Sequence, residues 1–250
     1  MCYKRLIPTV SNTRQLVVFF SIAFAFSWLV ETWMILAHAR IEFTILASLG
    51  PTVAAIVTDR LAHGSFRVFR FNVSWARTLA ASVIGILLIM VAYTILPATA
   101  VVDSSKLNWS VLVSTSVYNY STLLGGPLFE EPGWRGFVLP RLESRLSPVS
   151  SSLFLGVVWT AWHIPMFFYP GWASVPIWTY FMLLTGLSLI MTLGANIARF
   201  GLIAPILMHA MFNTNGRFLQ GLFKRNRVPV AFCPSSYRVG ACTSPYPSKR

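Results

Sequence analysis

The sequence predicts an all-α membrane protein, a polytopic transmembrane helical bundle of about seven spans. Of its 250 residues, 55% are hydrophobic and only 11% are charged, and the mean hydropathy is +0.63. Soluble domains carry about 25% charged residues, so this chain has too few charges to cover a globule in water. Its apolar residues also gather in runs close to the ~20 residues that a helix needs to cross a bilayer. These observations exclude an ordinary soluble domain, a disordered chain and a secreted module held by disulfides.

The apolar runs give the expected helices in order along the chain. The first run is too long for the apolar part of a signal peptide, so we expect it to remain as an anchor. The fourth, fifth and seventh runs are rich in Gly, Pro, Ser and aromatic residues, which is typical of helices packed inside a bundle. The candidate spans are approximately 15–37, 41–58, 77–99, 110–130, 149–168, 175–196 and 199–215.

Basic residues predict the orientation of the bundle. Lys and Arg number 20 against 7 Asp and Glu, for a formal net charge of +13. They gather before the first span and then in alternate gaps between spans, and such loops stay in the cytoplasm. We therefore expect a cytoplasmic N-terminus. Because the basic residues lie in short loops and not on one polar face, they indicate a lipid bilayer as partner and no nucleic acid.

The last part of the chain departs from this pattern. Residues 1–215 are expected to form a single membrane-embedded domain, and 216–250 a basic, polar tail. Seven spans would place this tail outside, against the charge rule. The tail contains no apolar run long enough to cross the membrane, so we expect it either to be cytoplasmic or to replace a final helix.

Ionisable residues inside the apolar runs are the candidates for function, because each costs at least ~2.5–3.5 kcal/mol to insert. Glu131 and Arg135 are four residues apart, so on a helix they face each other and can pair. Glu130 would then point about 100° away and remain free for chemistry. Pro132 cannot donate a backbone hydrogen bond, so we expect the helix to kink or restart beside these acids.

Two further segments carry polar side chains in separate spans. One contains His163, and the other contains His209 and Asn213, which share one helix face. Taken alone, the Glu131–Arg135 pair is more often an interfacial salt bridge, and His163 or His209 a packed residue or interhelical glue. Together, two carboxylates, two imidazoles and an amide are the groups of a hydrolytic site. Glu31 lies within the first span with no evident partner, and we assign it at most a substrate-facing role.

At these three segments the chain resembles the CPBP family of intramembrane proteases, which includes CAAX prenyl endopeptidases and the Abi-type bacteriocin-processing and self-immunity proteins. The Glu-Glu-x-x-x-Arg motif matches Glu130, Glu131 and Arg135. An aromatic residue four positions before a histidine matches Trp159 and His163, with Trp where Phe is frequent. The third motif, His-x-x-x-Asn, matches His209 and Asn213. The family fold is a bundle of typically eight helices around a water-filled cavity, so the departure after Gly216 falls at the expected last helix.

The resemblance implies an endopeptidase acting on a peptide or a prenylated or lipidated protein tail near the cytoplasmic face of a bacterial cell membrane. Glu130 would polarise the attacking water with His163, while His209 and Asn213 would stabilise the oxyanion. Arg135 would position the acids through Glu131. Glu130, His163 and His209 could instead hold Zn²⁺, which would make the enzyme a metalloprotease. Two alternatives remain: a non-catalytic immunity or maturation factor on the same fold, and a small transporter in which the acids relay protons.

Overall fold

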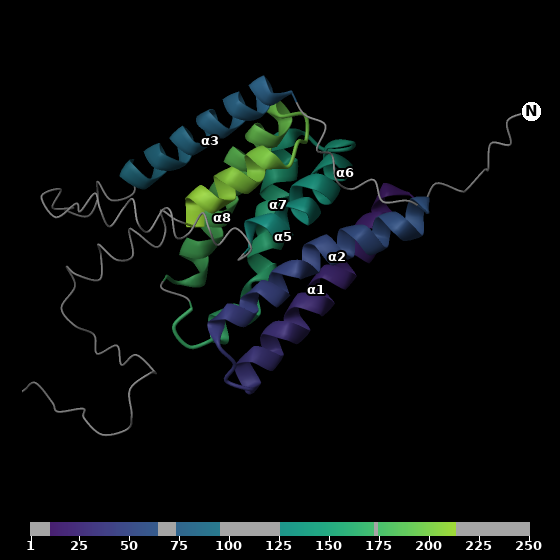
Figure 1. The fold of residues 1–250 in the computed structure, drawn as a ribbon, viewed down its shortest axis with the longest axis vertical. Coiled ribbons are helices and arrows are strands. Elements are labelled where there is room, and N and C mark those ends of the chain that lie inside the picture. Colours follow the sequence, from purple (N-terminus) through teal and green to yellow (C-terminus); the bar gives the residue numbers. More distant parts are fainter. Residues whose placement is uncertain (1–10, 65–73, 96–125, 173–174, 214–250) are drawn as a thin grey trace, which may run out of the picture.

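The computed structural model describes residues 11–64, 74–95, 126–172 and 175–213, and within these ranges the chain forms helices joined by turns, without a strand (Figure 1). The predicted all-helical class is confirmed. In chain order the elements are α1 (Asn12–Leu36), η1 (Ile41–Phe43), α2 (Thr44–His63), α3 (Trp75–Ile95), α5 (Pro127–Glu131), η5 (Pro132–Val138), α6 (Leu139–Glu143), α7 (Pro148–Trp162), η6 (Ile164–Phe168) and α8 (Ile177–Ile197), followed by a helix at Ile203–Asn213.

The described helices have the character of a membrane protein. Three helical stretches, Asn12–Leu36, Ile41–His63 and Ile177–Ile197, are long and apolar enough to cross a bilayer, and two shorter apolar helices accompany them. Large apolar side chains such as Leu29, Trp75 and Trp178 are more than two-thirds exposed, which suits lipid contact. The prediction of about seven spans reaches into 96–125 and past 213, outside the described residues, as does the basic tail at 216–250.

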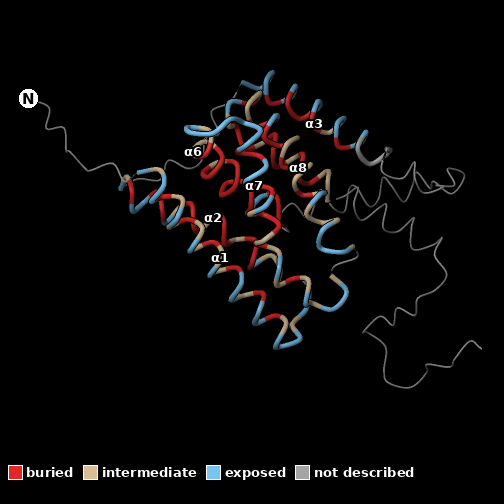
Figure 2. Tube along the Cα trace, turned by 180° about the vertical axis from the view of Figure 1, so that it is seen from behind, coloured by how far each residue is buried: buried red, intermediate tan, exposed pale blue. Residues whose placement is uncertain are grey.

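The order of the helices across the bundle differs from their order in the chain (Figure 1). α1 and α2 lie side by side on one flank, and α3 packs along α8 on the other. The chain from α5 to α6 contacts α2, while α7 contacts α8. Buried residues therefore concentrate in the middle, and the outward faces of α1, α3 and α8 are exposed (Figure 2).

The close pairing of α1 with α2 depends on a proline. Pro51 lies inside α2 and has no N–H to donate to the carbonyl of Ala47, four residues earlier. The hydroxyl of Ser27 on α1 donates to that carbonyl at 2.7 Å, in a buried position. A side chain from the neighbouring helix thus satisfies the group that the proline leaves open, as membrane helices require.

The helix continues past residue 130, where the fourth predicted span ends. The range 131–148, with Arg135, Arg141 and Arg145, falls between the fourth and fifth predicted spans, although the predicted pairing of Glu131 with Arg135 required a helix at its start. α5 continues directly into a π-helical segment that begins at Pro132, and then into α6. The expected disturbance at Pro132 thus takes the form of a wider helical turn, a feature frequent at functional sites.

The fifth predicted span, 149–168, also differs from the structure. α7 begins at Pro148 behind an N-cap, Ser147, whose hydroxyl accepts the N–H of Ser150 at 3.1 Å. It ends at Trp162, and the 3-10 helix η6 covers the last residues of the predicted span. Gly156 lets α8 approach closely, because a Cβ there would lie 2.8 Å from the Cα of Thr185. Small residues allow this kind of contact between membrane helices.

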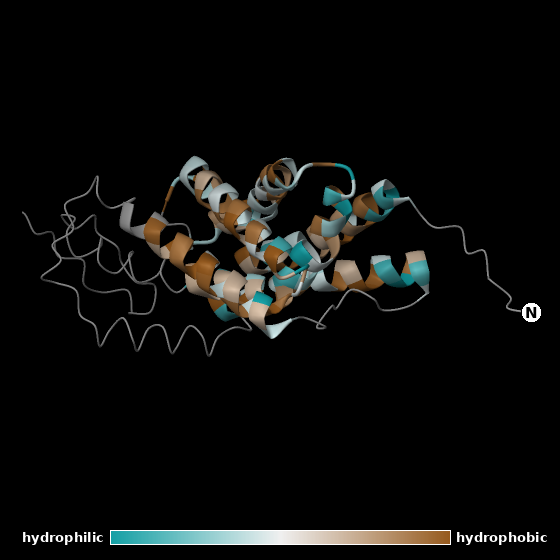
Figure 3. Cartoon of the chain, turned by 90° about the horizontal axis from the view of Figure 1, so that it is seen from above, coloured by the Kyte–Doolittle hydropathy of each residue, from teal (hydrophilic) through white to brown (hydrophobic). Residues whose placement is uncertain are grey.

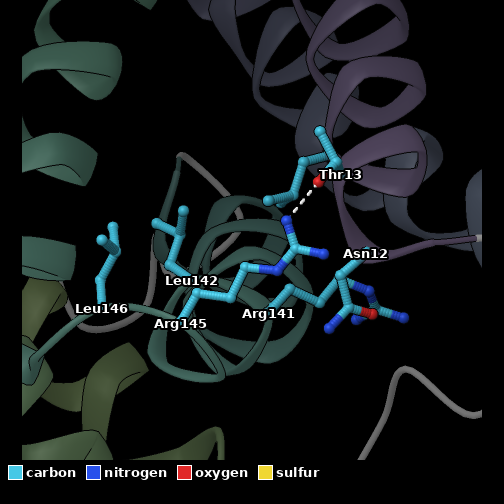
Figure 4. Close-up of a pocket in the computed structure, with 7 residues that line it drawn as sticks. Asn12, Thr13, Arg141, Leu142, Arg145 and Leu146 are labelled. Carbon is cyan, nitrogen blue, oxygen red and sulfur yellow. Dashed lines mark hydrogen bonds between the residues drawn. The ribbon is translucent and has the colours of Figure 1, made fainter.

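Hydrophilic residues collect at the helix ends nearest the N-terminus (Figure 3). There the guanidinium of Arg145 donates to Thr13 at the start of α1, and that of Arg141 lies 3.6 Å from Asp59 near the end of α2. A pocket of about 190 Å³ lies at this end of the bundle (Figure 4). It is lined by Asn12, Thr13, Leu16, Arg141, Leu142, Arg145 and Leu146, and none of the predicted catalytic residues borders it.

Candidate active site

The carboxylate of Glu131 lies at the centre of a buried polar cluster. One oxygen is 3.2 Å from Nη1 of Arg135, so the predicted pair is confirmed. The other accepts a hydrogen bond from Nδ1 of His209 at 2.7 Å. All three side chains are nearly or fully buried, with exposed fractions of 0%, 0% and 6%. Glu131 therefore connects the helix that carries the acids to the helix Ile203–Asn213.

Glu130 points to a different partner. Its Oε2 accepts a hydrogen bond from the indole Nε1 of Trp159 on α7 at 2.9 Å, and the residue is 4% exposed. The same indole lies 4.3 Å below the guanidinium of Arg135 and meets the ring of His209 edge to face at 5.0 Å. Trp159 thus contacts Glu130 and both partners of Glu131.

His163 follows the end of α7, and its ring is held by a backbone group. Nδ1 lies 2.8 Å from the carbonyl oxygen of Trp159. Because a carbonyl can only accept, Nδ1 carries the proton, and Nε2 of the neutral ring is an acceptor. The ring stacks on Trp172 at 5.8 Å and meets Trp162 and Tyr180 edge to face. His163 is thus oriented with one basic nitrogen left for a ligand or water.

Asn213 reaches the same region from the last described helix. A Cβ built on Gly126 would lie 3.8 Å from Nδ2 of Asn213 and 3.0 Å from Oε1 of Glu130. Gly126 also has a φ of +149°, which disfavours any larger residue there. The small residue therefore lets the amide and the carboxylate approach one another around a shared space.

The predicted zinc set does not assemble in the described chain. Among the described residues, no three His, Cys, Asp or Glu side chains are grouped so that they could hold a metal ion. Nδ1 of His209 binds Glu131 and Nδ1 of His163 binds a carbonyl, so Nε2 is the ring nitrogen that each histidine could offer to a ligand. Because the described side chains are not grouped as a metal site, we derive no step through a metal.

The sequence argument missed three participants. Trp159 was taken only as the aromatic position of a motif, although its N–H is what binds Glu130. Gly126 and Tyr180 were not singled out. A lone tyrosine among the apolar residues of α8 and a Gly-Gly pair just before the acids were the available signals. The role of these three residues depends on where along their lengths the helices meet. The spacing of residues along the chain does not give that position.

Fold and site together define a helical membrane protein with a buried cluster of glutamate, histidine and tryptophan. Comparison with known proteins is consistent with this class. Residues 105–215 match the model of the family described as type II CAAX prenyl endopeptidase Rce1-like. The segment with all three motifs therefore matches this family, and the predicted resemblance is confirmed.

One curated relative supports the same match. The chain is 30% identical over 105 residues to CAAX prenyl protease 2 of Methanococcus maripaludis. The aligned region spans 39% of this chain and 39% of the relative, so less than half of the relative's length is matched. No solved structure matches the chain significantly.

Proposed function

We propose that the protein is an intramembrane endopeptidase that hydrolyses a peptide bond in a peptide or a prenylated protein tail. The observation that carries this proposal is the different pairing of two adjacent glutamates. Glu131 is bound by Arg135 and His209, whereas Glu130 accepts from Trp159 among the described residues and lies beside Asn213. One carboxylate thus organises the cluster while the other is left to act as a base.

In the proposed reaction Glu130 removes a proton from a water molecule as its oxygen attacks the peptide carbonyl carbon. His163 accepts the second O–H of that water through Nε2, the nitrogen that its bond to Trp159 leaves available. The proton held by Glu130 then passes to the leaving amine as the C–N bond breaks. A positioned base of this kind contributes about 10²–10⁴-fold in rate.

His209 and Asn213 are the proposed donors to the oxyanion. Asn213 offers the N–H groups of its amide directly. His209 donates Nδ1–H to Glu131, so only its protonated ring has a second N–H, at Nε2, for an oxyanion. Donors held in place before the reaction stabilise charge as it develops, which is the usual basis of such catalysis.

We propose that substrates reach the site from the cytoplasmic side of a bacterial cell membrane, with the N-terminus in the cytoplasm. The start of α1 and the ends of α2 and α6 meet at one end, where Arg60, Arg141 and Arg145 collect. Positive residues mark the cytoplasmic side. The helical chain from Glu130 to Arg141 spans about 16 Å, so the proposed base lies well inside the bilayer from that end.

Cleavage of a farnesylated peptide that ends in a C-a-a-X sequence tests this proposal. The full-length protein in detergent should release the terminal tripeptide, and Glu130→Gln should reduce kcat by at least ~10²-fold. Glu42→Gln is a matched control, because Glu42 is 63% exposed and paired with Arg40 away from the site. Cleavage by Glu130→Gln at the parent rate would contradict the role of Glu130. A folded protein without any cleavage would favour the non-catalytic immunity or maturation factor.

A further inference from the structure

Glu31 is a buried carboxylate on α1 that the proposed mechanism does not use. The residue is 2% exposed, and its Oε2 has no hydrogen-bond partner among the described residues. An ionisable group at membrane depth is costly and is usually paired or functional. The group that binds the Oε2 atom of Glu31 therefore has to be identified.

The position of Glu31 is set by a neighbouring hydrogen bond. The indole N–H of Trp28, one turn earlier on the same face of α1, donates to the carbonyl of Trp162 at 3.0 Å. This contact holds that face of α1 against the turn that carries His163. Glu130 accepts from Trp159, one turn before Trp162 on α7. Glu31 and the proposed base are thus both on segments held against the end of α7.

Aromatic rings gather at the turn after α7 and the facing part of α8. The rings of Phe167, Trp172 and Tyr180 contact one another at 5.2–5.4 Å, and His163 contacts Trp172 and Tyr180. Aromatic faces attract cations, most strongly where water is excluded. Two carboxylates and a group of aromatic rings are therefore the surroundings in which a positive charge is stabilised.

A neutral hydrogen-bond donor would satisfy Glu31 less well. A peptide N–H could bind its free oxygen, but it would leave a buried carboxylate without a counter-charge. A cation supplies that counter-charge and makes a charge-assisted hydrogen bond, which is roughly twice as strong as a neutral one. Among the described residues Arg135 is paired with Glu131, so we assign the cation at Glu31 to the bound molecule.

We propose that Glu31 is a substrate-binding residue that recognises the side chain of a lysine or arginine a few residues from the scissile bond. The inference rests on the proposed function and adds a substrate class to it. The lysine or arginine side chain would lie against the aromatic rings at the turn after α7, and its charge would bind Glu31. The chain would then prefer substrates that bring their own positive charge into the membrane.

Paired peptides test this preference. In a series of farnesylated peptides a single lysine is moved through the residues on either side of the scissile bond, and each peptide has a partner with norleucine at that position. In the parent protein at least one lysine peptide should show kcat/KM about tenfold above its partner, and in Glu31→Gln this ratio should fall to about one. Glu42→Gln should keep the parent ratio, and thermal unfolding checks that both variants are folded.

Binding measurements separate the failure of this inference from the failure of the proposed function. The same pairs are titrated against Glu130→Gln with and without Glu31→Gln, where tighter binding of the lysine peptide should disappear when Glu31 is changed. If the parent cleaves nothing but this difference in binding is present, the protease proposal fails and the cation site stands. Equal ratios for every pair in the parent, or a preference that survives in Glu31→Gln, would overturn the cation site.

Discussion

Replacing Glu131 with glutamine should destabilise the protein strongly, whereas the same change at Glu130 should not. Glutamine keeps the shape of the side chain and one acceptor oxygen but removes the charge. At position 131 that charge faces the guanidinium of Arg135 at 3.2 Å and the ring of His209 at 2.7 Å. At position 130 the carboxylate accepts from a neutral indole, and an amide oxygen can accept that bond equally.

The size of the difference follows from these contacts. Two unit charges 3.2 Å apart attract by about 5 kcal/mol at the effective dielectric constant of ~20 that describes protein sites. Arg135 also interacts with the charge of Glu130, which remains in the variant and replaces part of the attraction. Breaking a buried pair costs about 3–5 kcal/mol, so we expect a loss near the lower end for Glu131→Gln. For Glu130→Gln the loss should stay below ~1 kcal/mol.

Reversible unfolding in mixed micelles, followed by tryptophan fluorescence, measures both losses. Arg135→Met provides the double-mutant test, because removing both charges leaves no uncompensated buried ion. The double variant Glu131→Gln/Arg135→Met should recover at least ~1 kcal/mol relative to the sum of the single losses. Equal losses for the two glutamate variants, or strictly additive losses in the cycle, would refute the assignment of Glu131 as the organising charge.

Three further substitutions test the packing around the site. Gly133→Ala should unfold the protein or cost several kcal/mol, since its Cβ would lie 2.5 Å from the carbonyl oxygen of Pro51; a stability equal to the parent in the micelle assay would contradict this close approach. Gly126→Ala should reduce kcat by more than any loss of folded protein accounts for, because its Cβ would lie 3.0 Å from a carboxylate oxygen of Glu130. An unchanged kcat would argue against that position for the base. Trp159→Phe removes the indole N–H and should cost about 1.5–3 kcal/mol of stability, whereas retained stability would show that Glu130 finds another donor.

The sequence predicted a contact within one helix of the site but not the contacts between helices. The Glu131–Arg135 pair was predictable because both residues lie on one helix, and the pair survives a π-helical segment beginning at Pro132. The contact of Glu131 with His209 joins residues 78 positions apart. Periodicity places each residue on a face of its own helix, but it gives neither the depth nor the rotation of one helix against another.

The end of the fourth predicted span at 130 has a related cause. Arginine in a membrane protein usually marks a cytoplasmic loop, and three arginines in a short range suggested one. Arg135, however, is 1% exposed and paired with Glu131 inside the bundle, whereas Arg141 and Arg145 lie at the end of the bundle beside α1 and α2. A buried arginine carries no information about loops, and composition alone cannot distinguish it from an arginine at the membrane surface.

The charge inventory of the cluster connects its stability with its proposed chemistry. Three carboxylates, those of Glu31, Glu130 and Glu131, lie in one buried region, and Arg135 is the permanent cation that the described structure places beside them. That cation is bound to Glu131, so a positive side chain carried by the substrate would supply the counter-charge for Glu130 and Glu31 in surroundings of low dielectric constant. Binding of a cationic substrate would therefore stabilise carboxylates whose burial is otherwise costly.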